Sequence, residues 1–403
     1  MKISALDKII GLVAAIQLVC GLDFTMVQPL GPQMAATLGA PASYIGYVTG
    51  AYAMAAFLAG LAGVGFLDRF DRRQALGVSI LGLVAATAMC AVAPNFIALI
   101  LARCVAGAFA APVIAMSYAI IADLVPLERR GRAIATASIS GSVATVLGLP
   151  LGVALAGWAG WRAPFLCIAG GGLVIALIAL RALPPMRGTV HGAGPPPLAD
   201  EANAVRGPLN RAALICAAIS AASGFAITSN IAAHLQVNLH YPVARFGQLY
   251  MVGGIVVFVV ARVSGRLIDR VGSWPVMLLA NLIYGATVLE LFIDQGAHAP
   301  ILLLFTGNML GNSLRNASLQ TLLTKIPPAG SRASFLSATG AVQQLGSAVG
   351  AVGSGLLLTQ VAGPRIEGMD RLGWIVLGLT LSLTPMVLVI EALRRSRRLA
   401  GGP

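Results

Sequence analysis

The chain has 403 residues, of which 58% are hydrophobic and 10% are charged, and its mean hydropathy is +0.86. Soluble domains carry about 25% charged residues, so this composition excludes an ordinary soluble protein. A formal net charge of +13 is compatible with a nucleic-acid partner, but the positions of the basic residues favour an orientation signal in a membrane.

Apolar segments long enough to cross a ~30 Å hydrocarbon core follow one another along the chain. They predict helices over residues 9–30, 43–66, 74–93, 97–123, 133–157, 162–183, 210–237, 246–268, 274–294, 299–324, 333–361 and 372–393. The expected fold class is therefore an all-α polytopic membrane protein with 12 transmembrane helices. A Pro-rich segment, 184–209, predicts a cytoplasmic linker between two six-helix bundles over 1–183 and 210–394, followed by a basic cytoplasmic tail over 395–403.

Basic residues collect on one side of these predicted helices. That side holds Arg69, Arg72, Arg73, Arg129, Arg130, Arg132, Arg187, Arg206, Arg270, Lys325, Arg332 and the tail arginines, whereas the other keeps Arg162, Arg245, Arg365 and Arg371. This bias predicts that both termini are cytoplasmic, in what we expect to be a bacterial inner membrane. The charge then orients the protein, and no nucleic-acid partner is expected.

The first predicted helix contains Asp23, and a carboxylate at this depth usually marks a proton or ion site. Asp23 lies roughly 21 Å from the cytoplasmic end of its helix, at 1.5 Å per residue. Arg103 lies roughly 9 Å from the outer end of the fourth helix, and therefore at about the same depth of a ~30 Å core. A pair that makes and breaks would change the proton affinity of the carboxylate, whereas a static pair would only orient the first and fourth helices.

The fifth predicted helix carries Gly148, Pro150 and Gly152. Glycines let helices approach closely, and a proline loosens the helical backbone. Ordinary close packing is the alternative to a transport-specific role for this segment.

The second half repeats landmarks of the first. Leu67-Asp68-Arg69 ends the second predicted helix, and Ile268-Asp269-Arg270 ends the eighth. Gly160-Trp161 and Gly373-Trp374 precede the body of the sixth and twelfth helices in the same way. Such internal repetition is typical of secondary transporters, whose substrate site lies near the midplane between the repeats.

Polar residues inside the predicted helices are candidate substrate contacts. Asn308, Asn312, Arg315 and Asn316 form one stripe on the tenth helix, which we expect to face a central cavity because a lipid-facing stripe is costly. Further candidates are Gln28, Asn230, His234 and Gln343. Interhelical hydrogen bonding is the competing interpretation for each of them.

The two halves carry a loop motif that resembles the major facilitator superfamily. The family pattern Gly-x-Leu-x-Asp-Arg-x-Gly-Arg-Arg appears in the second half as Gly265-Arg266-Leu267-Ile268-Asp269-Arg270-Val271-Gly272. In the first half it is Gly65-Phe66-Leu67-Asp68-Arg69-Phe70-Asp71-Arg72-Arg73, where the first glycine is shifted by one position and Asp71 replaces the second. The resemblance implies two pseudo-symmetric six-helix bundles. It also implies that Asp68, Arg69, Arg72, Arg73, Gly265, Asp269, Arg270 and Gly272 form a conformational latch, for which topology-setting charges are the alternative.

Two shorter segments resemble elements of proton-coupled members of this superfamily. Arg103-Cys104-Val105-Ala106-Gly107 is similar to a helix-4 Arg-x-x-x-Gly element, which implies a part for Arg103 in proton transfer. Gly148-Leu149-Pro150-Leu151-Gly152 looks like a variant of the helix-5 motif of drug and metabolite efflux antiporters.

These patterns predict a secondary transporter that exports a small organic molecule, such as a drug or metabolite, in exchange for protons by alternating access. A proton-coupled uptake symporter is the alternative within transport, and a non-transporting receptor or a membrane-embedded enzyme is the alternative outside it. Because the sequence has no Gly-x-x-x-x-Gly-Lys-Ser/Thr loop, we expect the proton gradient rather than ATP or a cofactor to supply the energy. The four histidines are scattered, so no metal site is expected, and the partners should be substrate, protons and lipid around a monomer.

Overall fold

A computed structural model describes residues 5–63, 70–184, 207–294, 298–327, 332–360 and 365–399. Two compact units divide the chain: Met1–Pro41 with Tyr47–Pro195, and Ala42–Gly46 with Pro196–Pro403. Most of the segment 184–209 that the sequence predicts as a linker lies outside the described residues, so the linker stays a prediction. The described residues are helical throughout, apart from turns and one isolated bridge between Thr359 and Glu367.

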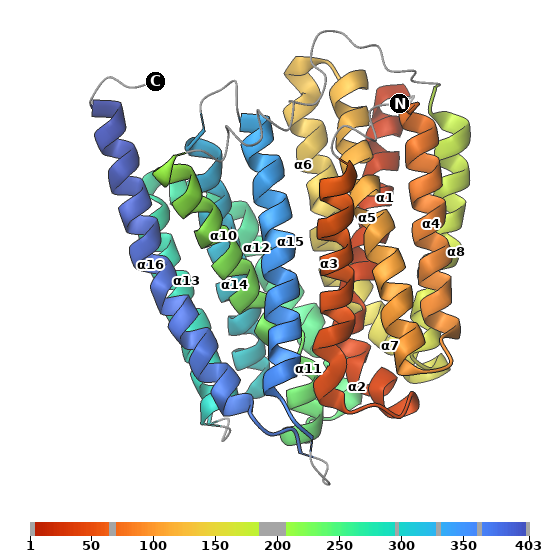
Figure 1. Cartoon of the computed structure of the whole chain (residues 1–403), viewed down its shortest axis with the longest axis vertical. Coiled ribbons are helices and arrows are strands. Elements are labelled where there is room, and N and C mark those ends of the chain that lie inside the picture. The colour runs from red at the N-terminus through yellow and green to blue at the C-terminus, as the bar shows by residue number, and fades with distance from the viewer. Residues whose placement is uncertain are drawn as a thin grey trace. The chain divides into compact units, whose positions relative to one another are not determined.

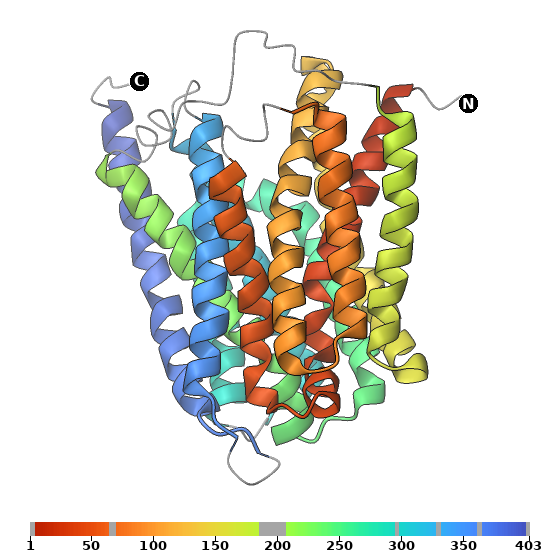
Figure 2. The same cartoon turned by 45° about the vertical axis from the view of Figure 1, so that its right-hand side comes forward.

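Within each unit the long helices run alongside one another (Figures 1 and 2). The helices up to the linker are α1 (Ala5–Thr25), α2 (Val27–Thr37), η1 (Ala42–Tyr44), α3 (Ile45–Gly63), α4 (Arg72–Val92), α5 (Phe96–Leu124), α6 (Leu127–Val143), η3 (Ala144–Gly148), α7 (Leu149–Ala159) and α8 (Arg162–Ala182). Those after the linker are α10 (Pro208–Thr228), α11 (Ile231–Ala233), η4 (His234–Asn238), η5 (Val243–Arg245), α12 (Phe246–Val271), α13 (Ser273–Val288), η6 (Leu289–Ile293), α14 (Ile301–Lys325), α15 (Arg332–Leu357) and α16 (Met369–Leu399).

Each predicted span has a helical counterpart, so the all-α polytopic fold class is confirmed. Nine helices in the described part of the chain are long and apolar enough to cross a membrane. The other three counterparts are α14, α15 and the segment formed by α6, η3 and α7. Polar residues such as Asn308, Asn312 and Arg315 on α14 lower the hydropathy of such helices.

The predicted ends are wrong in several places. The first span is interrupted at Met26 and continues as α2 to Thr37, within a stretch predicted as a loop. Pro32 lies in the second turn of α2, where it cannot donate the backbone hydrogen bond to the residue four positions earlier. The fifth predicted helix begins at Leu127 rather than 133, and the last extends to Leu399 rather than 393.

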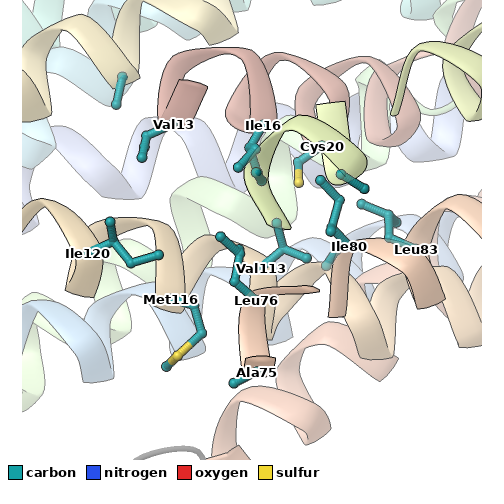
Figure 3. Close-up of a cluster of buried hydrophobic side chains, with 14 of the residues drawn as sticks. Val13, Ile16, Cys20, Ala75, Leu76, Ile80, Leu83, Val113, Met116 and Ile120 are labelled. Atoms are coloured by element: carbon teal, nitrogen blue, oxygen red, sulfur yellow. The ribbon is translucent and has the colours of Figure 1, made fainter. Parts of the chain in front are cut away.

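A hydrophobic core holds the first unit together. Figure 3 shows Val13 and Ile16 of α1, Ile80 of α4, and Val113 and Met116 of α5 among its side chains. These five residues are at most 4% exposed. This apolar packing fixes α1, α4 and α5 against one another, and the same three helices carry the polar residues of the candidate site.

Candidate functional site

A buried ion pair joins α1 to α5. Arg103 Nη1 lies 3.2 Å from Asp23 Oδ2 and also donates a hydrogen bond to the Asp23 backbone carbonyl at 3.0 Å. Both side chains are 0% exposed. The equal depths inferred from the sequence thus correspond to direct contact. Removing one partner of a buried ion pair leaves the other charge uncompensated and is strongly destabilising, so each residue depends on the other.

The Asp23 carboxylate has a second partner, on α4. Thr87 Oγ1 lies 2.8 Å from Asp23 Oδ1, and the same hydroxyl lies 2.8 Å from the carbonyl oxygen of Leu83, one turn earlier. Thr87 is buried. One carboxylate oxygen therefore contacts α4 and the other contacts α5.

Tyr52 of α3 completes the surroundings of this pair. The guanidinium carbon of Arg103 lies 4.2 Å from the centre of the Tyr52 ring, a cation–π distance. The Tyr52 ring also contacts Phe24, with centroids 5.1 Å apart. Four helices, α1, α3, α4 and α5, thus contribute to one buried polar site.

Gly148 in η3 and Gly152 in α7, which belong to the fifth predicted helix, pack next to this site. A Cβ on Gly148 would lie 2.0 Å from Leu22 Cδ2, and one on Gly152 would lie 2.4 Å from the Met26 side chain. Leu22 directly precedes Asp23 in α1. Pro150 follows the π-helical turn η3 (Ala144–Gly148), a wide turn of a kind that is frequent at functional sites. The Gly/Pro segment therefore brings a locally widened helix into close contact with α1.

In the first copy of the loop motif, Asp68 and Arg69 lie outside the described residues. Arg72 Nη1 lies 2.5 Å from Asp123 Oδ2 of α5, and Arg73 donates to the carbonyl of Leu180 on α8. These contacts join helix ends within the first unit, and a latch role for the motif stays a prediction.

Asp71, which departs from the family pattern, has a local function. Its Oδ1 accepts hydrogen bonds from the backbone N–H groups of Arg73 and Gln74, at 2.9 and 3.2 Å. It is therefore the N-cap of α4, a position that favours aspartate.

In the second copy of the motif the glycine is kept and a distant side chain provides the cap. Gly272 has φ +96°, a conformation that favours glycine, and it joins α12 to α13. Glu391 Oε1 of α16 accepts the Ser273 backbone N–H at 2.9 Å, at the start of α13. Asp269 pairs with Lys325 at 3.5 Å, Arg270 is exposed at the end of α12, and Gly265 has open space where a side chain would lie.

The second unit contains a buried arginine of a different kind. Arg315 is 0% exposed, and its guanidinium carbon lies 4.4 Å from the Tyr284 ring centre. It donates to Ser223 Oγ at 3.1 Å, to the Ser220 carbonyl at 3.2 Å and to Asn312 Oδ1 at 2.8 Å. No carboxylate of the described residues lies within ion-pair distance.

Part of the polar stripe on α14 contacts neighbouring helices, although the sequence predicted that the stripe faces a cavity. Asn308 donates to Thr287 of α13 at 3.3 Å, and Arg315 contacts α10 and α13, while Asn316 is exposed. Such contacts are what the interhelical alternative predicts.

The remaining substrate candidates occupy separate places. Asn230, in the break between α10 and α11, donates to Ser354 Oγ at 2.7 Å. His234 Nε2 lies 2.6 Å from the Leu291 carbonyl, and its ring stacks on Phe292. His234 thus has a packed ring and a hydrogen-bond partner, and a role in substrate contact stays a prediction. Gln28 is buried on α2, and Gln343 accepts from Gln320 at 3.4 Å.

Two carboxylates and a histidine, Glu290, Asp294 and His298, lie close together in the structure. The scattered positions of the histidines in the sequence did not predict this cluster. His298 Nδ1 lies 3.1 Å from Asp294 and 3.6 Å from Glu290, at the end of η6 (Leu289–Ile293). His298 and Asp294 are exposed, so the contacts account for these residues as a surface ion-pair cluster.

Sequence reasoning missed Thr87, Tyr52 and Glu391. Counting the depth along 74–93 places Thr87 roughly 20 Å from the cytoplasmic end, close to Asp23, so the rule that paired Asp23 with Arg103 would have found it. Tyr52 resembles an ordinary core residue, and Glu391 caps a helix far away in the sequence, so neither leaves a local signal.

Comparisons with known proteins place this geometry in context. The sequence model described as Major Facilitator Superfamily matches residues 13–351. A chloramphenicol resistance protein of Streptomyces lividans is 30% identical over 315 residues, which cover 76% of this chain and 77% of that protein. A chloramphenicol efflux pump of Mycobacterium tuberculosis is 33% identical over 35% of this chain and 34% of its own length.

Among solved structures, a nucleoside transporter superposes with a TM-score of 0.76 over 96% of this chain and 99% of its own. Its sequence identity is 14%, so this similarity concerns the fold alone.

Proposed function

Because the chain belongs to the Major Facilitator Superfamily, we propose that it exports a small organic molecule in exchange for protons. It is an integral membrane transporter rather than an enzyme. Chloramphenicol is the first candidate substrate, since two similar bacterial proteins are named for resistance to it or for its efflux. The proposal includes an inner-membrane location, cytoplasmic termini, a monomeric state and no cofactor.

The buried contact between Asp23 and Arg103 is the observation that carries the proposal. A carboxylate inside a membrane protein is expensive and commonly serves a proton or ion pathway. When Asp23 is ionised, the pair has no net charge, and one bound proton leaves a net positive charge in the first unit. A change of this kind at the centre of four helices gives protonation a means to favour one conformation over another.

The energy available through one such site is sufficient. A membrane potential supplies about 2.3 kcal/mol per charge per 100 mV. At about 1.4 kcal/mol for each factor of ten, one proton driven by 100 mV supports a substrate gradient of about fortyfold.

The Gly/Pro segment at residues 148–152 supports export rather than uptake. Its motif resembles that of efflux antiporters, and its glycines lie against Leu22 of α1 and against Met26, the residue between α1 and α2. The π-helical turn η3 lies beside the proton site, so protonation of Asp23 on α1 can act on the segment formed by η3 and α7.

Reconstituted vesicles test the proposal. Purified protein in liposomes with an acidic interior should accumulate radiolabelled chloramphenicol, because protons leave as the substrate enters. Asp23→Asn should abolish the accumulation, whereas Asp7→Asn, which changes an exposed carboxylate at the start of the same helix, should not. Accumulation driven only by an acidic exterior would instead identify a symporter, and equal activity of Asp23→Asn would remove Asp23 from the mechanism.

A further inference from the structure

We propose that Thr87 is a positioning residue whose hydrogen bond with Asp23 reverses direction when Asp23 binds a proton. The inference rests on the proposed protonation of Asp23 and concerns how that event reaches α4. It is carried by the two contacts of one hydroxyl, 2.8 Å to Asp23 Oδ1 and 2.8 Å to the Leu83 carbonyl.

The Thr87 hydroxyl has one proton and two acceptors. When Asp23 is ionised, the charged oxygen is the stronger acceptor, so the hydroxyl donates to Oδ1. The Leu83 carbonyl loses nothing essential in this state, because it also accepts the backbone N–H of residue 87 within α4. The ionised site is therefore fully compatible with Thr87 turned towards α1.

The protonated site requires the opposite arrangement. Oδ2 faces Arg103 Nη1 at 3.2 Å, and a guanidinium group can only donate. A proton on Oδ2 would have no acceptor there, so the incoming proton resides on Oδ1. The Oδ1–H group then donates to Thr87 Oγ1, and the Thr87 hydroxyl turns to donate to the Leu83 carbonyl.

This exchange needs no transfer of a proton from threonine. One proton enters from solution and forms one O–H bond on Asp23, while Thr87 only rotates its hydroxyl. Arg103 keeps its hydrogen bond to the Asp23 backbone carbonyl at 3.0 Å throughout. Proton binding therefore changes the contact between α1 and α4 while the contact between α1 and α5 persists.

Other titratable groups face Asp23 from each neighbouring helix. They are Arg103 and Cys104 on α5, Tyr52 on α3, Cys20 on α1 itself and Cys90 on α4, and each interacts electrostatically with the carboxylate or its arginine. Tyr52 also interacts with the Asp23 side chain through its hydroxyl. The test must therefore separate Thr87 from Tyr52.

Infrared difference spectroscopy of the full chain in lipid nanodiscs provides the test. An acid jump should produce the carbonyl band of a protonated carboxyl group, and Asp23→Asn should remove it. Thr87→Val, which keeps the side-chain shape but has no hydroxyl, should move the band to higher frequency. Thr87→Ser should restore the original frequency, and Tyr52→Phe should leave it unchanged.

The same titrations give the proton affinity of the site. Thr87→Val should bind the proton about fivefold more tightly, because the ionised state loses a charge-assisted hydrogen bond and the neutral state loses a weaker one. Thr87→Ala provides the same comparison if the valine variant does not fold.

Each possible result either supports or overturns the role of Thr87. A band that depends on Asp23 but is identical in wild type and Thr87→Val overturns the role of Thr87 and leaves the proposed function in place. A shift in Tyr52→Phe alone assigns the acceptor to Tyr52 and overturns it too. A band that persists in Asp23→Asn contradicts protonation of Asp23, and the proposed function fails together with the inference.

Discussion

The backbone of Tyr52 lies directly against Gly107, one helical turn after Arg103 on α5. A Cβ at position 107 would lie 2.1 Å from the Tyr52 carbonyl oxygen. This close approach of α3 to α5 holds the Tyr52 ring 4.2 Å from the Arg103 guanidinium carbon. The Arg-x-x-x-Gly element thus has a physical explanation, in which the glycine makes room for the residue that covers the arginine.

Gly107→Ala should therefore damage the site without changing any of its polar groups. The added methyl group must separate α3 from α5, and overpacking of this kind costs about 1–3 kcal/mol. We expect a lower melting temperature and a loss of most proton-linked transport in vesicles. Gly141→Ala is the matched control, since open space surrounds that position on α6. Equal activity of the two variants would contradict a role for the close contact.

Variants of Arg103 separate charge balance from coupling. Arg103→Ala leaves a buried carboxylate unpaired, which costs about 3–5 kcal/mol, whereas Arg103→Lys keeps a cation near Asp23. The double change Asp23→Asn with Arg103→Gln removes both charges and should recover most of the stability. Thermal unfolding and vesicle transport should thus diverge: the double variant should be stable but inactive. Full transport in Arg103→Ala would make the pair dispensable.

The sequence predicted the positions of the long helices better than the breaks and π-helical turns within them. A carboxylate and an arginine stand out in apolar helices, so depth alone brought Asp23 to Arg103. The break at Met26 and the turn η3 (Ala144–Gly148) depend on tertiary contacts with neighbouring helices, which periodicity does not reveal. The capping of α13 by Glu391 likewise joins residues 118 positions apart.

The contact between Gly148 and α1 gives another prediction. Gly148→Ala places a methyl group against Leu22, next to Asp23, with an ideal separation of only 2.0 Å. Leu22 can shift, so we expect a small change in melting temperature but at least a severalfold lower transport rate. Gly157→Ala on α7, where nothing lies within 4 Å, should behave like wild type in the same vesicle assay. Similar rates for both variants would show that η3 only packs against α1 at this position.

Loss of the cap in either loop motif should lower the stability of the protein. Asp71→Ala removes the N-cap of α4 and should lower stability by about 1 kcal/mol, while Asp71→Asn keeps an acceptor and should be nearly neutral. Glu391→Ala should have a comparable effect through α13. Thermal unfolding of the purified variants measures all three. A stable Asp71→Ala variant would mean that Asp71 is not required as a cap.

Arg315 gives a prediction about the substrate, because its contacts fit both helix packing and recognition. A buried guanidinium without a carboxylate partner in the described residues is costly, and replacing it with a methionine of similar length removes the cost of burying a charge. We therefore expect Arg315→Met to melt close to wild type. If Arg315 binds an acceptor group of the substrate, the KM for transport should rise at least tenfold, as loss of a charged hydrogen bond implies.

Arg315→Lys should be intermediate, since lysine keeps the charge but not the planar group that stacks on Tyr284. Arg266→Met, a change at an exposed position on α12, is the matched control and should alter neither quantity. Substrate recognition by Arg315 predicts a change in KM, whereas helix packing predicts a change in melting temperature. An unchanged KM together with a large fall in melting temperature would assign Arg315 to helix packing. The loss of its three hydrogen bonds, to Ser223 and Ser220 on α10 and to Asn312 on α14, would then outweigh the relief of desolvation.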